Sequence, residues 1–161
     1  MKQDSNLVST QASCTVRQPQ PGDYDRIAEL AGQLGYECTG KEVRERLCEM
    51  HDSNQYAVYI AELPGGLVAG WIGAYVFRSV ETGSCAEING LVIDERLRSS
   101  GIGRILLSAF EEWAQSVGCD AVSVRSNVMR ERAHRFYARN AYELVKTQSV
   151  FRKNLPAREN G

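Results

Sequence analysis

Residues 91–104 join an apolar segment to the start of an amphipathic segment through a short loop of polar and small residues. The first N–H groups of a helix have no partner within that helix, and the helix dipole makes this end positive. Serine and glycine would leave those amides accessible to a phosphate group, and Arg98 and Arg104 can add charge-assisted hydrogen bonds. The spacing therefore predicts a loop that binds a pyrophosphate.

Two better-known phosphate-binding patterns do not fit this loop. A Walker loop needs lysine after its last glycine, but Gly103 is followed by Arg104. A dinucleotide fingerprint needs a third glycine where this chain has Leu106. The remaining pattern is R-x-x-G-x-G, filled by Arg98, Gly101 and Gly103. A glycine-rich helix start without a ligand is the alternative interpretation.

The hydrophobic periodicity predicts the elements that would position this loop. In chain order they are a strand at 14–17, helices at 24–34 and 39–50, strands at 55–63, 67–77 and 86–93, a helix at 101–117, a strand at 121–125, a helix at 129–139, and strands at 142–146 and 150–153. This order predicts an α/β fold with a mixed central sheet of about six to seven strands and about four flanking helices.

Residue types at the segment ends indicate how the helices begin and end. Asp23 can cap the first helix, and Asn127 can cap the last one. Thr39 and Glu42 have the spacing of a capping box at the start of the second helix. Gly118 suits the end of the long helix at 101–117.

The composition is that of an ordinary soluble globular protein, with 43% hydrophobic and 24% charged residues. The formal net charge of −1 argues against a nucleic-acid partner. No apolar run reaches transmembrane length and the N-terminus has no signal-peptide core, so we expect no membrane partner and a cytoplasmic location. Five scattered cysteines and two histidines do not indicate a disulfide framework or a metal site.

Two blocks of the sequence together resemble the GNAT superfamily of acetyl-CoA-dependent N-acetyltransferases. Residues 91–93 followed by 98–103 are similar to its signature strand and acetyl-CoA loop, and Ser126-Asn127, with residues 133–137, is similar to its later block. The resemblance extends from about residue 87 to 155. It implies a GNAT-like acetyltransferase domain over residues 14–155, between a disordered leader at 1–13 and a tail at 156–161.

One position departs from the family's pattern. The family usually has glycine before the aromatic residue that follows the last helix, whereas this chain has Ala141 before Tyr142. Because asparagine tolerates a left-handed conformation, we expect Asn140 to adopt it instead.

The resemblance implies acetyl-CoA as the acetyl donor. Residues 99–104 would hold its pyrophosphate, the backbone of residues 91–93 would pair with the pantetheine arm, and an N–H near Val92 would polarise the thioester carbonyl. Asn127 would contact the arm from the other side. The predicted donor-binding residues are Leu91, Val92, Ile93, Arg98, Ser99, Ser100, Gly101, Ile102, Gly103, Arg104, Asn127 and Tyr137.

Two side chains are the candidates for proton transfer. Tyr137 occupies the position of the family's general acid, although a core tyrosine is the alternative interpretation. Glu87 is the candidate base and would share the face of Leu91 if no bulge intervenes, the alternative being a solvent-exposed strand glutamate. His134 on the last helix is a weaker candidate base, since a solvated helix histidine is the favoured interpretation.

Three aromatic residues are candidates for binding the acceptor amine, because aromatic faces attract cations. They are Tyr36, Trp71 and Tyr75, with Glu87 beside them, and the alternative is that they are ordinary core and surface residues.

The predicted reaction is direct transfer of acetyl to a primary amine in a ternary complex. A small molecule is the expected acceptor because residues 127–153 also resemble small-molecule GNAT enzymes, including aminoalkylphosphonate acetyltransferases. An aminoglycoside-type polyamine, a protein N-terminus or a lysine remain alternatives for the acceptor. A non-catalytic acetyl-CoA-binding module and a plain nucleotide-phosphate binder are rival functions. A homodimer is an expectation from the family alone.

Overall fold

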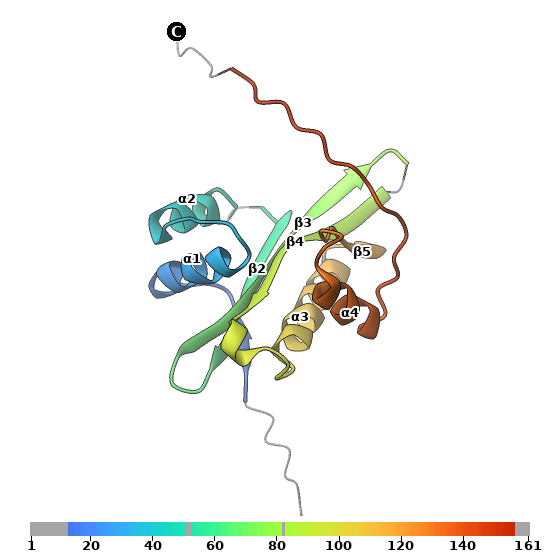
Figure 1. Ribbon diagram of the computed structural model, residues 1–161. Coiled ribbons are helices and arrows are strands. Elements are labelled where there is room, and N and C mark those ends of the chain that lie inside the picture. The colour runs from blue at the N-terminus through green and yellow to red at the C-terminus, as the bar shows by residue number, and fades with distance from the viewer. Residues whose placement is uncertain (1–12, 51–52, 82, 157–161) are drawn as a thin grey trace, which may run out of the picture. The chain divides into compact units, whose positions relative to one another are not determined.

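The computed structural model describes residues 13–50, 53–81 and 83–156 of the chain (Figure 1). Most of the predicted leader, residues 1–12, and most of the predicted tail, residues 157–161, therefore lie outside the described residues. The chain divides into two compact units, residues 1–125 and residues 126–161.

The first unit contains the sheet and three of the four α-helices. Its elements are β1 (Thr15–Arg17), α1 (Tyr24–Gln33), α2 (Gly40–Met50), β2 (Tyr56–Leu63), β3 (Leu67–Ser79), β4 (Gly83–Ile93), α3 (Ile102–Ser116) and β5 (Ala121–Val124), with 3₁₀ turns η1 (Pro21–Asp23) and η2 (Glu95–Leu97). Each predicted element of this unit is present, with bounds that differ by a few residues.

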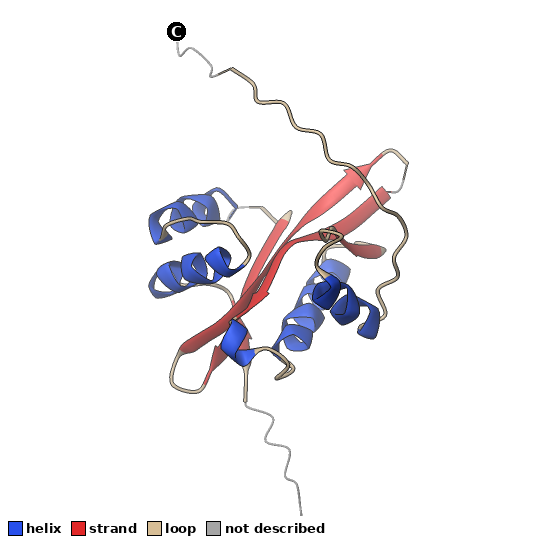
Figure 2. Ribbon diagram, viewed as in Figure 1, coloured by secondary structure: helices blue, strands red, loops and turns tan. Residues whose placement is uncertain are grey.

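The sheet is mixed, as predicted, and its strand order is β1-β2-β3-β4-β5 (Figure 2). The first four strands pair antiparallel, and β5 pairs parallel with β4. The sheet has five strands among the described residues, so the prediction of six to seven was too high.

The missing strands are those predicted at 142–146 and 150–153. Residues 142–156 contain no strand, and their apolar side chains are exposed, with exposed fractions of 87% for Leu144 and 94% for Phe151. Alternating β-branched and aromatic residues make a segment compatible with a strand. A strand also needs a partner to satisfy its backbone hydrogen bonds, and the pattern does not supply one.

Helices cover both faces of the sheet. Helices α1 and α2 lie against one face and α3 lies along the other (Figure 1). The α3 side of the core is built on Phe110 and Leu106, which are fully buried, while Ile105 is 39% exposed. None of the described helices has the length and apolar character needed to cross a bilayer.

The predicted helix starts fare differently in the structure. The capping box of α2 is confirmed, because the Thr39 N–H donates to Glu42 Oε2 over 2.8 Å and the Glu42 N–H donates to Thr39 Oγ1 over 3.2 Å. The predicted Asp23 cap is wrong, because the Asp23 carboxylate instead accepts bonds from the Gln20 N–H at 2.6 Å and from Arg17 at 2.7 Å. A charged guanidinium is a stronger partner than a helical amide.

The second unit contains α4 (Glu131–Arg139) and the extended residues that follow it. Asn127 does not cap this helix, because its Oδ1 accepts the N–H of Met129 over 2.9 Å in a turn that precedes Glu131. An Asx turn of this kind satisfies asparagine locally, so the helix begins two residues later than predicted.

The end of α4 contradicts the prediction for Asn140. Ala141 itself adopts the left-handed conformation, with φ of 64°, whereas Asn140 has φ of −104°. The Tyr142 N–H donates to Tyr137 O over 3.0 Å and the Ala141 N–H donates to Ala138 O over 3.3 Å, which is the Schellman pattern. Those two bonds fix the left-handed position at Ala141. The Asn140 amide instead donates to Phe136 O over 2.8 Å.

Candidate active site

The parallel pairing of β4 with β5 ends halfway along β4. The paired residues run from Cys85 opposite Ala121 to Ile88 opposite Val124, whereas β4 continues to Ile93. In the first unit, no described strand pairs with this side of residues 89–93. An unpaired strand edge of this kind can accept an extended ligand as an added strand.

The backbone groups on this edge belong to Leu91 and Ile93. The Asp94 N–H donates to Ala69 O on β3 over 2.8 Å, and alternate residues of an antiparallel pair exchange such bonds. The register therefore directs the backbone groups of Val92 towards β3 and those of Leu91 and Ile93 away from it. The N–H groups that can bond to a ligand here are those flanking Val92.

A β-bulge changes the face on which Glu87 lies. The register of β3 with β4 shifts so that Asn89 is an extra residue on β4. In a strand without a bulge, side chains alternate regularly, and Glu87 would lie on the same face as Leu91, as expected from the sequence. The extra residue reverses that alternation, and Glu87 shares the face of Val92, which packs with residues of α1 and α2.

Glu87 is a buried carboxylate with three hydrogen-bond donors around it. Its exposed fraction is 8%, so the alternative of a solvent-exposed strand glutamate does not apply. Tyr75 Oη donates to Oε1 over 2.6 Å, while Arg125 Nε at 3.1 Å and Ser123 Oγ at 3.4 Å bond to Oε2. The hydrogen bond to Glu87 and burial raise the pKa of the Tyr75 phenol, because ionising it would place two negative charges together.

Asp94 fixes the start of the loop that follows β4. Its carboxylate is 1% exposed and accepts the Arg96 N–H at 3.0 Å and the Arg96 guanidinium at 2.8 Å, while Arg26 of α1 bonds to it from the other side. The hydrogen bonds from Arg96 and Arg26 hold the pKa of Asp94 well below its usual range. Arg98 then donates from Nε to Ile93 O over 3.3 Å and ties the loop back to the strand.

The helix α3 begins with amides that no side chain caps. Gly101 occupies the N-cap position with φ of 88° and has no side chain to bond the first N–H groups. The first hydrogen bonds at the start of α3 come from the N–H groups of Arg104 and Ile105, both to Gly101 O. The N–H groups of Ile102 and Gly103 come before these first intrahelical donors in the chain.

The space beside Gly101 at this helix start is open. A Cβ built on Gly101 would meet no atom within 4 Å, so no side chain fills the position next to the amides. The Arg98 and Arg104 side chains are exposed. Positive helix-end amides with nearby guanidinium groups match the doubly charged diphosphate of acetyl-CoA.

Two of the three aromatic candidates lie on the same face of the sheet as Glu87. Tyr75 is bonded to it, and Trp71 lies against the backbone at Gly90, where a Cβ would come within 2.6 Å of the indole ring. The Trp71 indole nitrogen is buried and bonds to no described protein atom, an uncommon state for a buried donor. Tyr36 lies between α1 and α2 and is 69% exposed.

The remaining candidates belong to the second unit. Tyr137 lies on α4 with its ring centroid 5.2 Å from that of Phe136 and 5.5 Å from that of Tyr142. Burial raises the pKa of Tyr137 to about 12. His134 is exposed, with its Nε2 3.0 Å from Asn127 O, as expected for a solvated helix histidine.

Sequence reasoning missed Arg125 and Asp94. Each follows a strand directly, Arg125 after β5 and Asp94 after β4, and a charged residue at a strand end is the signal that could have found them. Their partners, Glu87 and Arg26, are 38 and 68 residues away in the sequence, so only the tertiary structure reveals the pairs.

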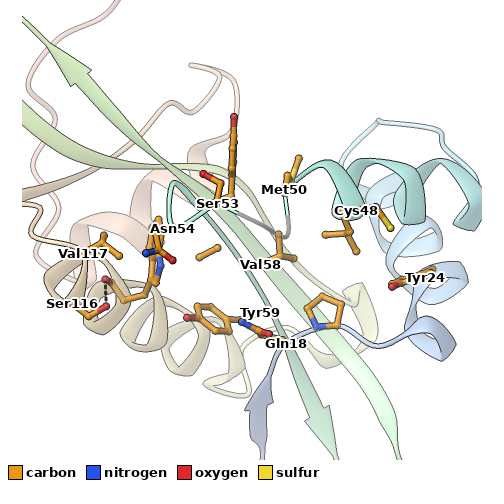
Figure 3. A pocket seen from close by; sticks show the side chains of 15 residues that line it. Gln18, Tyr24, Cys48, Met50, Ser53, Asn54, Val58, Tyr59, Ser116 and Val117 are labelled. Carbon is orange, nitrogen blue, oxygen red and sulfur yellow. Dashed lines mark hydrogen bonds between the residues drawn. The ribbon is translucent and has the colours of Figure 1, made fainter.

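A hollow of about 700 Å³ lies elsewhere, along β2 (Figure 3). It forms because β1 pairs only with residues 60–62 of β2 and leaves the edge at residues 56–59 without a described strand. Its walls are Gln18, Pro19, Tyr24, Leu47, Cys48, Met50, Ser53, Asn54, Tyr56, Ala57, Val58, Tyr59, Trp113, Ser116 and Val117. None of the predicted site residues lines it, so it is separate from the candidate active site.

Comparison with known proteins finds a family model and two relatives. The family model of the acetyltransferase (GNAT) family matches residues 24–142. The chain is 26% identical to an aminoglycoside N(6')-acetyltransferase type 1 of Stenotrophomonas maltophilia, over 88% of this chain and 94% of that protein. It is 35% identical to an aminoalkylphosphonate N-acetyltransferase of Salmonella typhimurium, over 58% of this chain and 59% of that protein.

Solved structures share the fold. An aminoglycoside acetyltransferase, AAC(6')-Iy, in complex with a bisubstrate analogue of CoA superposes with a TM-score of 0.78 at 16% identity, covering 89% of this chain and 100% of that one. Glucosamine-6-phosphate N-acetyltransferase from Arabidopsis thaliana superposes with a TM-score of 0.76 at 19% identity, covering 88% and 99% of the two chains.

Proposed function

The chain belongs to the GNAT acetyltransferase family, is an N-acetyltransferase and uses acetyl-CoA as its donor, and from this we propose that it acetylates the primary amine of a small molecule. The observation that carries the proposal is the pairing of two features at the end of β4. No described strand pairs with one edge of residues 89–93, and the loop after this strand leads into a helix start whose first amides no side chain caps.

The donor would be held along its length by these two features. The amides of residues 99–104 would bind its pyrophosphate, with Arg98 and Arg104 adding charge. The backbone groups of Leu91 and Ile93 would bond to the pantetheine arm as an added strand does. When bound, acetyl-CoA supplies the acetyl group as a thioester, whose C–S bond breaks as the amine nitrogen forms the new C–N bond.

Two side chains would move the protons of this reaction. Glu87 would take a proton from the acceptor ammonium at a carboxylate oxygen, directly or through water. Its carboxylate is buried and bonded to polar neighbours, which hold it in one position. Tyr137 would donate the proton of Oη to the leaving sulfur. Burial raises the pKa of this phenol to about 12, so it carries its proton at neutral pH.

A small-molecule acceptor is supported by the relatives rather than by any one residue. The two curated relatives named above carry the names of enzymes that act on an aminoglycoside and on aminoalkylphosphonates. Trp71 and Tyr75, which share a face with Glu87, would supply the aromatic wall that suits a cationic amine.

The experiment that tests the proposal is a free-thiol release assay with acetyl-CoA and a panel of small amines, peptide N-termini and lysine peptides. We expect release of CoA thiol with at least one small amine, and mass spectrometry should detect the acetylated product. Transfer only to the peptides would contradict the small-molecule acceptor. Tight binding of acetyl-CoA without release with any member of the panel would contradict the proposed acceptor class.

A further inference from the structure

The Glu87–Arg125 ion pair lies where β4 and β5 cease to pair. Arg125 directly follows Val124, the last residue of β5, which is opposite Ile88. Its Nε is 3.1 Å from Glu87 Oε2, and its side chain is nevertheless 63% exposed. One edge of the guanidinium is therefore bound to the buried carboxylate, while the terminal nitrogens have no hydrogen bond to a described residue.

This arrangement gives the site one negative and one positive group side by side. Glu87 is nearly enclosed and its charge is already balanced by Arg125, so the pair as a whole is neutral. An acceptor with several positive charges would have to place one of them near the guanidinium, where like charges repel. An acceptor with an ammonium and an acidic group would complement both partners.

We infer that the acceptor of this enzyme is a short amine that carries its own acidic group, a phosphonate, phosphate or carboxylate, which the terminal nitrogens of Arg125 bind. This inference rests on the proposed function and names its substrate class. The planar guanidinium matches a phosphonate or carboxylate in two parallel hydrogen bonds. Because Nε and the terminal nitrogens belong to one guanidinium, the amine and the acid must be close together in the acceptor.

Three amines of equal chain length separate the charge classes. They are 2-aminoethylphosphonate, ethanolamine and ethylenediamine, whose second group is anionic, neutral and cationic. With the full chain, we expect a kcat/KM at least tenfold higher for the phosphonate than for either of the other two. Arg125→Gln should lower kcat/KM at least tenfold more for the phosphonate than for ethanolamine, with the additional loss mainly in KM. Arg125→Lys should restore part of the loss.

A matched control is Arg46→Gln on α2, which removes an exposed arginine that pairs with Glu42 at 3.6 Å and lies outside the site. It should leave all three values unchanged. The inference is overturned if the unaltered enzyme prefers ethylenediamine or ethanolamine. It is also overturned if Arg125→Gln lowers kcat for all three amines equally, since Arg125 would then only position Glu87.

If the proposed function itself is wrong, the assay gives a different result from the ones above. In that case no small amine releases thiol, whatever its charge. Calorimetric titration of 2-aminoethylphosphonate into the acetyl-CoA-loaded protein and its Arg125→Gln variant then still tests the inference. Equal affinity of the two proteins, or no binding by either, would overturn it.

Discussion

At the scale of single residues, environment decides which ionisable groups suit proton transfer. Tyr75 and Tyr137 are both phenols with raised pKa values, but for different reasons. Tyr75 donates a hydrogen bond to Glu87, whereas the main cause of the raised pKa of Tyr137 is burial. A phenol committed to a carboxylate is a poor acid for another group, so Tyr137 is the better candidate for the donor.

Removing the Tyr137 hydroxyl should therefore impair chemistry without impairing donor binding. We expect Tyr137→Phe to lower kcat by about 10²–10⁴-fold, the range typical of a positioned general acid. Calorimetry should show that acetyl-CoA still binds, because phenylalanine keeps the aromatic ring. Because the Tyr137 pKa is raised to about 12, the unaltered enzyme should show no loss of kcat from its deprotonation below about pH 10. A variant with normal turnover would exclude Tyr137 from the mechanism.

Ala141 has a left-handed backbone, with φ of 64°, that suits glycine better than alanine. The left-handed conformation costs a residue with a Cβ about 1–2 kcal/mol, while glycine loses about 0.5–1 kcal/mol more entropy on folding. Ala141→Gly should therefore raise the free energy of unfolding by about 0.5–1 kcal/mol, measured by denaturant titration. Ala138→Gly within α4 is the control and should lower it by about 1 kcal/mol. Two variants that change stability in the same direction would contradict the strain at Ala141.

At the scale of elements, buried charges join segments that are distant in the sequence. Asp94, at the end of β4, bonds both to Arg26 on α1 and to Arg96 in the loop that leads to the predicted donor site. Through this carboxylate, the packing of α1 on the sheet fixes where the loop begins. The loop geometry thus depends on a helix that starts 70 residues before Asp94.

Asp94→Asn should lower the free energy of unfolding by about 3 kcal/mol, because it breaks the ion pairs that a 1% exposed carboxylate makes with Arg26 and Arg96. The folded-state pKa of Asp94 lies below its unfolded value, so its contribution is fully present above the unfolded pKa of about 3.9 and is lost as the pH falls through the folded value. Denaturant titrations should give a constant difference between pH 5 and 8 that shrinks in strong acid.

The control for this change is Glu29→Gln, which removes the 62% exposed partner of Arg26. Exposed pairs contribute little, so its effect should stay within about 0.5 kcal/mol. A loss of stability as large as that of Asp94→Asn, or a difference that grows in acid, would contradict the assigned role.

At the scale of the whole molecule, the predicted site residues are divided between the two compact units. Glu87 and the donor loop belong to the first, and Asn127 and Tyr137 belong to the second. The family match over residues 24–142 spans the boundary between them. We propose that residues 14–155 act as one acetyltransferase domain.

Donor binding should then stabilise the whole chain by mass action. At a concentration one hundred times its Kd, acetyl-CoA should add about 2.7 kcal/mol, which for a chain of this size raises the melting temperature by about 5–10 °C. Differential scanning fluorimetry should show one cooperative transition that moves in this way. A larger shift with ATP or NAD would instead favour a general nucleotide-phosphate site.

The sequence by itself determined the features that depend on neighbouring residues. The Thr39–Glu42 capping box, the helix that begins after Gly101 and the order of the elements in the first unit all follow from local spacing, since their hydrogen bonds and apolar faces span only a few residues. The same local patterns predicted strands after residue 142 that the structure does not have. An alternating pattern does not provide the neighbouring strand with which a strand must pair.

Tertiary structure decided what depends on partners far along the chain. The bulge at Asn89 is set by pairing with β3, and it moved Glu87 to the face of Val92. The bond from Arg125 to Glu87 exists because β5 returns beside β4 after an intervening helix. Cross-strand register and charge pairing depend on interactions between segments that are distant in the sequence. A short stretch of sequence therefore does not determine them.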